Sequence, residues 1–226
     1  MISSGLRPRA VIFDLDGTLV DSLADIAAAM NAALAELGLP GHAPDAYRDF
    51  IGDGVEPMAQ RALPPERRDA ASVAACVARW RPRYLAGLVE QTRPYPGIGA
   101  LLEALTARGL RLAVLSNKAD DLSKRIVTAL FPGGPLSPGG PFAEVWGARE
   151  GVPKKPDPTA ARAIAQALGT APEGCLYVGD TAIDLDTAQA AGMVPVGVLW
   201  GFRPEQLRER APAHLLEQPA ELLGLL

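Results

Sequence analysis

The sequence has few of the residues that build disulfide-linked folds or thiolate metal sites. Among 226 residues there are two cysteines, Cys76 and Cys175, and two histidines. Two cysteines this far apart form neither a disulfide framework nor a local metal motif, so both are predicted to be reduced, buried thiols. The histidines, His42 and His214, belong to no motif and are interpreted as non-catalytic.

Long apolar runs and a strong excess of one charge are also missing. No apolar segment approaches the roughly 20 residues of a membrane span, and the first nine residues lack the apolar stretch of a secretory signal. The net charge of −4 argues against attraction to nucleic acid or an anionic membrane. We therefore expect a cytoplasmic protein in which an anionic ligand would need a local cluster of cations. The sequence leaves the oligomeric state open between a monomer and a homodimer.

Hydrophobic residues make up 48% of the chain, enough for a substantial core. Short apolar runs, predicted to be buried strands, alternate with amphipathic segments, predicted to be helices. The predicted strands are 9–14, 110–116, 144–147, 175–179 and 194–198, and the predicted helices between them are 98–108, 120–130, 157–168 and 182–191. This α/β alternation favours a parallel sheet with helices on both faces.

The stretch between the first two predicted strands is helical throughout. A helix is predicted over 22–38, with Ser22 as its N-cap and Asp25 in its first turn. The pattern remains helical over 44–90, with breaks at Gly52-Asp53-Gly54 and at two consecutive prolines. So long a helical stretch does not fit a single crossover between strands.

We therefore expect two domains. An α/β core would be formed by residues 1–20 and 92–226, and an all-helical domain, 21–91, would be inserted into it. A segment rich in glycine and proline, 131–141, is interpreted as a surface loop.

Polar side chains cluster where the predicted strands end. The clusters are Asp14 with Asp16, Ser116 with Asn117 and Lys118, and Asp180 with Asp184, while Lys155 lies in a loop ahead of a helix. Ligands of open parallel sheets bind beyond the carboxyl ends of the strands. Clustered carboxylates are costly to bury without a cation, and oxygen ligands favour a hard ion such as Mg²⁺. A carboxylate can accept a phosphoryl group, and a second carboxyl nearby can act as acid and then base.

The same residues resemble the four motifs of the haloacid dehalogenase superfamily, in the family's order. The segments are Asp14-Leu-Asp16-Gly-Thr18, Leu115-Ser116-Asn117-Lys118, Lys155-Pro-Asp-Pro158 and Gly179-Asp180-Thr-Ala-Ile-Asp184. The resemblance covers nearly the whole chain. It implies a doubly wound, mainly parallel, Rossmann-like core with an inserted helical cap, as in phosphoglycolate phosphatase-like members.

The resemblance also implies roles for the first two motifs. Asp14 would be the nucleophile and a Mg²⁺ ligand. Asp16 would be the general acid/base and would bind the metal through its backbone carbonyl. Ser116 and Asn117 would hold the transferring phosphoryl group. The presence of Asp16, which the haloacid-cleaving branch lacks, favours phosphate over carbon–halogen chemistry.

Roles for the last two motifs follow in the same way. Lys155, directly before the proline, would neutralise charge on the nucleophile and the phosphate, while its neighbour Lys154 is interpreted as solvated. Asp180 would be a metal ligand, and Asp184 would bind the metal directly or support a ligand. For Lys118 two interpretations stay open, a source of positive potential at the mouth of the site or an exposed loop lysine.

In the expected cap, Gly52-Asp53-Gly54 resembles a loop that faces substrate in phosphoglycolate phosphatases, although a simple helix break is equally compatible with it. Hinges are expected near 20–22 and 91–96. Three arginines of the cap are candidates for binding a substrate anion: Arg48, Arg61 and Arg83.

The leading hypothesis is a magnesium-dependent phosphatase that hydrolyses a small phosphorylated metabolite, with phosphoglycolate as the leading candidate. The alternatives are a phosphosugar mutase, a pyrophosphatase or a nucleotidase on the same scaffold, or a catalytically silent phosphate-binding relative. The filled catalytic positions count against the silent relative. The lack of a convincing histidine–lysine set in the expected cap counts against the mutase.

Overall fold

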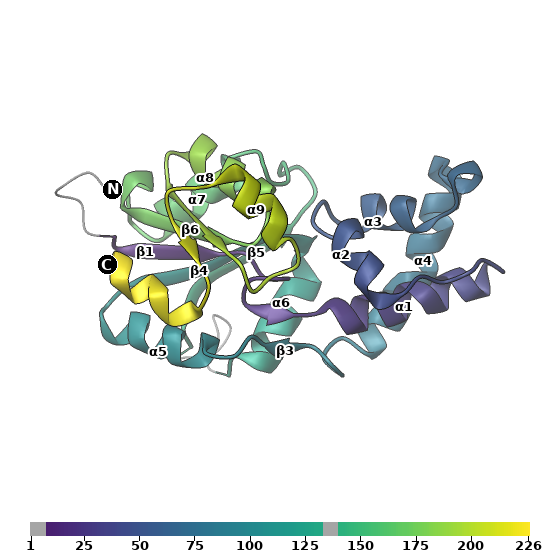
Figure 1. The fold of residues 1–226 in the computed structure, drawn as a ribbon, viewed down its shortest axis with the longest axis horizontal. Helices are drawn as coiled ribbons and strands as arrows, with labels where there is room; N and C mark the ends of the chain where they lie inside the picture. The colour runs from purple at the N-terminus through teal and green to yellow at the C-terminus, as the bar shows by residue number, and fades with distance from the viewer. Residues whose placement is uncertain (1–7, 133–139) are drawn as a thin grey trace.

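The computed structural model of the chain describes residues 8–132 and 140–226, so most of the predicted loop over 131–141 lies outside the described residues. A six-stranded sheet with the order β5-β4-β1-β6-β7-β8 forms the centre, and all its neighbouring strands are parallel (Figure 1). The strands are β1 (Ala10–Phe13), β4 (Arg111–Ala119), β5 (Phe142–Ala148), β6 (Cys175–Gly179), β7 (Val194–Val198) and β8 (Leu215–Leu216). The predicted α/β class with a parallel sheet is confirmed.

Helices cover both faces of this sheet because side chains alternate along each strand. In β1, Val11 and Phe13 belong to the hydrophobic cluster shared with α5 and α6, whereas Ala10 and Ile12 belong to the cluster shared with α7 and α8. The helices of this part are α5 (Ile98–Ala107), α6 (Asp120–Leu130), α7 (Thr159–Ala167), α8 (Ala182–Ala191), α9 (Pro204–Arg210) and the 3₁₀ segments η3 (Pro172–Gly174) and η4 (Pro219–Leu225).

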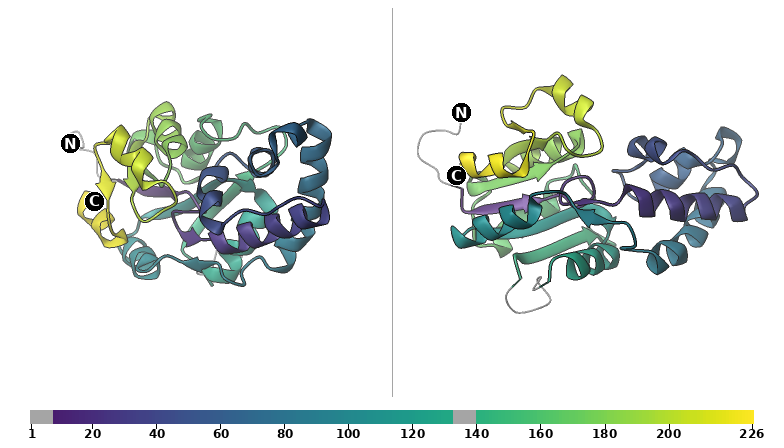
Figure 2. Two further views of the ribbon diagram at one scale, coloured as in Figure 1. Left: turned by 45° about the vertical axis from the view of Figure 1, so that its right-hand side comes forward. Right: turned by 60° about the horizontal axis from the view of Figure 1, so that its bottom comes forward.

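Between β1 and β4 the chain forms a helical unit that lies beyond one end of the sheet (Figure 2). Its elements are α1 (Leu23–Glu36), η1 (Pro44–Ala46), α2 (Tyr47–Phe50), α3 (Val55–Ala62), η2 (Pro65–Arg67) and α4 (Ala70–Ala86). These helices share a hydrophobic cluster, in which Met30, Tyr47 and Tyr84 are fully buried and to which the α/β part contributes Leu122 and Phe202. The breaks between α2 and α3 and before η2 fall where the sequence predicts them.

The chain enters and leaves the helical unit along two adjacent strands. The short β2 (Val20–Asp21) pairs antiparallel with β3 (Arg93–Pro94). Asp25 ties the two crossings together, because its buried carboxylate accepts hydrogen bonds from the backbone N–H groups of Gln91 and Thr92 and from the Thr92 hydroxyl. The two segments predicted as hinges therefore lie side by side.

Some local predictions differ from the structure. The strand predicted to end at Ser116 continues to Ala119, with a register irregularity after Leu115. Helix α7 begins at Thr159, two residues after the predicted start, and Pro158 is its N-cap residue. No helix in the ranges 8–132 and 140–226 has the length and apolar character needed to cross a membrane.

Candidate active site

The topology brings the predicted clusters together at one edge of the sheet. Asp14 directly follows β1, Asp180 directly follows β6, and Ser116 lies three residues before the end of β4. Strand β1 pairs with both β4 and β6, and the Asp14 backbone N–H donates to Val178 O at 2.9 Å. Three segments that are distant in the sequence thus end at one place.

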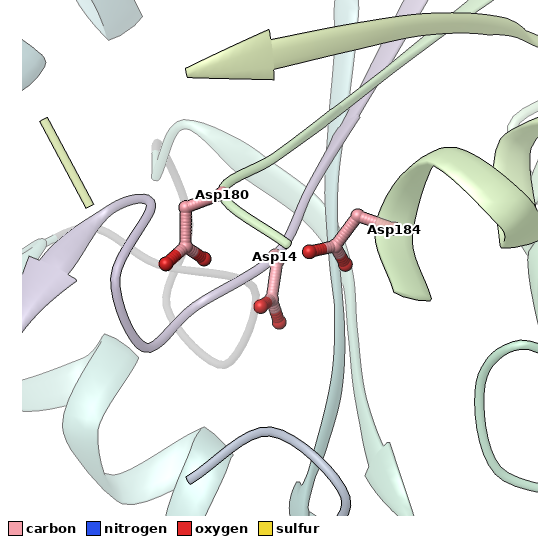
Figure 3. Close-up of side chains that lie close together, drawn as sticks. All are labelled: Asp14, Asp180 and Asp184. Carbon is pink, nitrogen blue, oxygen red and sulfur yellow. The ribbon is translucent and has the colours of Figure 1, made fainter. Parts of the chain in front are cut away.

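Three buried carboxylates converge there: those of Asp14, Asp180 and Asp184 (Figure 3). One oxygen from each lies within 4.8 Å of the others. Asp180 accepts hydrogen bonds from the Thr18 hydroxyl at 3.2 Å and from the Phe202 backbone N–H at 2.8 Å. Gly17 packs so closely against Asp180 that a larger residue would not fit, since a Cβ on Gly17 would lie 2.2 Å from Asp180 Oδ2.

Lys155 is the cation of this cluster. Its Nζ lies 2.8 Å from Asp14 Oδ1 and 2.7 Å from Asp184 Oδ1, and its side chain is only 3% exposed. Burial alone would lower the pKa of Lys155, but the two carboxylates more than offset this effect and raise the pKa well above its ordinary value. Lys154, by contrast, is partly exposed and forms a 3.4 Å ion pair with Glu56.

A single lysine does not balance three carboxylates. Burial raises the pKa of Asp14 to about 7; Lys155 opposes this shift, and Asp184 adds to it. Burial also raises the pKa of Asp180 well above its ordinary value, with further contributions from Asp184 and Asp14. Asp14 Oδ1 is buried and accepts no well-aligned hydrogen bond from the described residues. The excess negative charge and the oxygen-only donors fit a divalent cation held by these three carboxylates.

Asp16 is not part of this carboxylate cluster, and its carboxylate contacts another lysine. Its carboxylate lies 2.7 and 2.9 Å from Lys118 Nζ and accepts a hydrogen bond from the Ser22 hydroxyl at 2.5 Å. Ser22 is the N-cap residue of α1, as predicted, but its hydroxyl holds Asp16 and forms no capping hydrogen bond with the helix. Lys118 is 7% exposed, which excludes its interpretation as an exposed loop lysine. Burial would lower the pKa of Lys118, but Asp16 reverses the shift and keeps the ammonium charged.

The Asn117 side chain is fully engaged with the protein. Its Oδ1 accepts a hydrogen bond from the Lys155 backbone N–H at 2.9 Å, and its Nδ2 donates to Gly52 O at 3.0 Å and to Lys155 O at 3.1 Å. In this arrangement Asn117 fixes the loop that carries Lys155. Ser116 Oγ accepts a hydrogen bond from the Lys118 backbone N–H at 3.2 Å. Ser116 and Asn117 both line the cavity described below, and their contacts with a phosphoryl group stay a prediction.

A cavity of about 70 Å³ lies between the strand ends and the helical unit. From the core it is lined by Asp14, Asp16, Ser116, Asn117, Lys118, Lys155 and Phe202, among others, and from the helical unit by Gly52, Gly54, Met58, Trp80 and Arg81, among others. Gly54 has φ +100°, and a Cβ there would lie 2.8 Å from Lys154 Nζ. Asp53 is not among the lining residues, and its carboxylate pairs with Arg61.

The arginines predicted to bind a substrate anion do not line the cavity. Arg48 pairs with Asp45, and Arg83 pairs with Glu36. Arg61, in addition to Asp53, donates to the Phe50 carbonyl. Each of the three arginines is thus paired with an acidic side chain of the helical unit, and the geometry gives no support to them as anion ligands.

Other cations, which the sequence patterns did not single out, hold the helical unit over the strand ends. Arg203, which follows β7, donates to the carbonyls of Arg48, Asp49 and Ile51 at 3.0, 2.8 and 2.6 Å. Arg81 of α4 pairs with Asp121 of α6 at 2.6 Å. These contacts join residues far apart in the sequence, and no local motif marks them.

Comparison with known proteins gives the same family that the motifs resemble. The family model described as haloacid dehalogenase-like hydrolase matches residues 11–198. The phosphoglycolate phosphatase of Aquifex aeolicus is 38% identical over 218 residues, which cover 96% of each chain. That of Rhodospirillum rubrum is 36% identical over 221 residues, 95% of this chain and 89% of the relative. A crystal structure of a predicted phosphoglycolate phosphatase from Haemophilus somnus superposes with a TM-score of 0.86 at 29% identity, covering 96% of this chain and 97% of that one.

Proposed function

The chain belongs to the haloacid dehalogenase-like hydrolase family, and we propose that it hydrolyses small phosphate monoesters through an aspartyl-phosphate on Asp14, with phosphoglycolate as its substrate. The chemistry rests on one observation above all: the Asp14 carboxylate shares a buried cluster with Lys155, Asp180 and Asp184. The choice of phosphoglycolate rests on the relatives that match nearly the whole chain.

The residues of the site divide the reaction between them. Asp14 attacks phosphorus as the bond to the leaving alcohol breaks, and Asp16 gives its proton to the alcohol oxygen. Asp16 then takes a proton from water, which attacks the phosphorus and restores Asp14 with release of phosphate. Lys155 and the Ser116 hydroxyl stabilise the phosphoryl oxygens throughout.

Mg²⁺ is the cation we propose for the carboxylate cluster, held by Asp14, Asp180 and Asp184 together with the Asp16 carbonyl. When bound, it would screen the repulsion between the carboxylates and the phosphate dianion. The fit is supported by the excess negative charge and by the absence of sulfur or nitrogen from the donor set.

Stabilisation by Mg²⁺ is expected to grow with pH. The folded pKa of Asp14, about 7, lies above the value of about 3.9 in an unfolded chain, so protonation of Asp14 favours the metal-free folded state at low pH. That contribution is lost as the pH rises from about 4 through 7, where Mg²⁺ can replace the proton. At pH 8, Mg²⁺ at about 100-fold above its Kd should raise Tm by about 5–10 °C. At pH 5 the same Mg²⁺ concentration should raise Tm by clearly less.

Thermal unfolding with EDTA or Mg²⁺ at both pH values checks this prediction. In Asp180→Asn, most of the rise in Tm that Mg²⁺ causes at pH 8 should be lost. At these carboxylates protons compete with the metal, so an equal rise in Tm at pH 5 and pH 8 would argue against metal binding there.

The helical unit over 21–91 is proposed to act as a cap that excludes water while the phosphoryl group is on Asp14. The paired β2 and β3, joined through Asp25, are the proposed hinge. Arg203 and Asn117 would favour the closed arrangement, since both bond to carbonyls of the helical unit.

Substrate choice is tested by phosphate release with Mg²⁺ from a panel of phosphoglycolate, sugar phosphates, nucleoside monophosphates and pyrophosphate. The proposal predicts the highest kcat/KM for phosphoglycolate. A higher kcat/KM for pyrophosphate or a nucleotide would replace phosphoglycolate as the proposed substrate. Isomerisation of a sugar phosphate without phosphate release would indicate a mutase, and ligand binding without turnover would indicate a silent relative.

A further inference from the structure

Lys118 has no part in the mechanism described above, yet its ammonium group lies inside the site. The side chain is 7% exposed and lines the cavity. Its Nζ lies 2.7 and 2.9 Å from the two carboxylate oxygens of Asp16 and 4.9 Å from the centre of the Tyr84 ring. Asp16 is the carboxylate that Lys118 pairs with, and Lys118 forms no ion pair with Asp14, Asp180 or Asp184.

The position of Asp16 places Lys118 on the leaving-group side of the substrate. To protonate the alcohol oxygen, the Asp16 carboxyl must come within about 2.6–3.2 Å of it. An ammonium group in contact with the same carboxyl then lies within about 6 Å of that oxygen, since the two contacts share Asp16. In phosphoglycolate a single carbon separates the ester oxygen from the carboxylate. The substrate carboxylate therefore falls within reach of Lys118 Nζ.

The other cations that line the cavity are engaged elsewhere. Lys155 lies between Asp14 and Asp184 on the phosphoryl side. Arg203 donates to three backbone carbonyls of the helical unit. Arg81 pairs with Asp121 at the rim, where its side chain is 44% exposed. Lys118 alone among these four is in contact with the proposed general acid.

An aromatic platform fixes the ammonium group in place. Tyr84 lies beneath Lys118 Nζ, and Trp80 stacks on Tyr84 with ring centres 4.6 Å apart and planes inclined by 16°. Both aromatic residues belong to α4 and are buried. A charge held over aromatic faces and away from water interacts more strongly with an anion than a solvated one does. The platform comes from the helical unit, so it is complete only when that unit covers the strand ends.

We infer that Lys118 is a specificity-determining residue that binds the carboxylate of an α-phosphoryloxy acid and so selects phosphoglycolate over uncharged phosphate esters of equal size. This assignment rests on the proposed function. It gives the site two cations with separate tasks, Lys155 for the phosphoryl group and Lys118 for the acid group of the leaving alcohol.

The test compares phosphoglycolate with phosphoglycolamide, which replaces the carboxylate by a neutral amide of the same size. Removing Lys118 also disturbs Asp16, but that effect slows both substrates, so the ratio of their kcat/KM values isolates recognition of the carboxylate. Wild-type enzyme should prefer phosphoglycolate by about 100-fold, and Lys118→Met should reduce the preference to below about 5-fold. Lys118→Arg should retain more than about 10-fold, because it keeps the charge.

Lys154→Met is the matched control, since it removes a lysine that is 41% exposed and does not line the cavity, and it should leave the ratio unchanged. If Lys118→Met slows both substrates equally and preserves the ratio, Lys118 only positions Asp16 and the inference is overturned. If wild-type enzyme hydrolyses other esters but not phosphoglycolate, the proposed substrate is wrong, which is a different and distinguishable failure.

Discussion

Asp14→Asn is expected to lower kcat for phosphoglycolate by about 10⁴-fold or more, because an amide cannot accept the phosphoryl group. The fold should survive the change. Burial raises the pKa of Asp14 to about 7, so a neutral isostere removes a carboxylate that is costly to ionise near Asp180 and Asp184. Metal-free Asp14→Asn should therefore unfold at pH 8 at the same temperature as wild type or higher.

Phosphate release and thermal unfolding of the same preparations separate the two effects. Asp45→Asn makes the same chemical change at a side chain that is 87% exposed, and should alter neither measurement. Turnover that persists within tenfold of wild type in Asp14→Asn would remove Asp14 from the role of nucleophile. If Tm falls together with activity, misfolding accounts for the loss of activity. Asp14→Glu would then distinguish misfolding from loss of the nucleophile, since it keeps the charge but displaces the carboxylate.

Lys155→Met should have the second largest effect, and it should reduce both activity and stability. Without the ammonium group, Asp14 and Asp184 lose the cation that lies 2.8 and 2.7 Å from them. We expect kcat/KM to fall by about 10³-fold and the free energy of unfolding of the metal-free protein at pH 8 to fall by about 3–5 kcal/mol, because one partner of a buried ion pair is removed.

Lys154→Met is again the matched control, because it differs by one position and removes a partly exposed lysine with a 3.4 Å ion pair. It should change the free energy of unfolding by less than about 1 kcal/mol. Urea unfolding and steady-state kinetics of the two variants decide the matter. Similar losses in both, or a larger loss in Lys154→Met, would show that the two lysines have been assigned the wrong roles.

The parts of the site that lie at strand ends were predictable from the sequence. Apolar runs mark β1, β4 and β6, and in a parallel sheet their carboxyl ends must meet at one edge. Asp14, Ser116 and Asp180 therefore come together for reasons of topology that can be recognised from local patterns. Lys155 could be distinguished from Lys154 only by its place in a motif, since both are lysines in the same loop.

The parts that depend on contacts between the helical unit and the core were not predictable. Ser22 has the sequence context of a helix cap, but Asp16 lies within reach and takes its hydroxyl. Lys118 is buried only because Asp16 and the aromatic residues of α4 surround it. Arg203 is joined to the end of α2 by contacts that span more than 150 positions. Such contacts depend on how two units pack, which periodicity and propensity do not encode.

Direct capture of the phosphoryl group tests the central claim, that Asp14 accepts it. Wild-type enzyme is mixed with phosphoglycolate and Mg²⁺, quenched at successive times through the first turnover, and treated with borohydride, which reduces an acyl phosphate to an alcohol. Peptide mass spectrometry should then find homoserine at position 14, rising and falling with the turnover and missing from Asp14→Asn. Homoserine at another aspartate, or no reduced residue at any time while phosphate is released, would contradict the assignment.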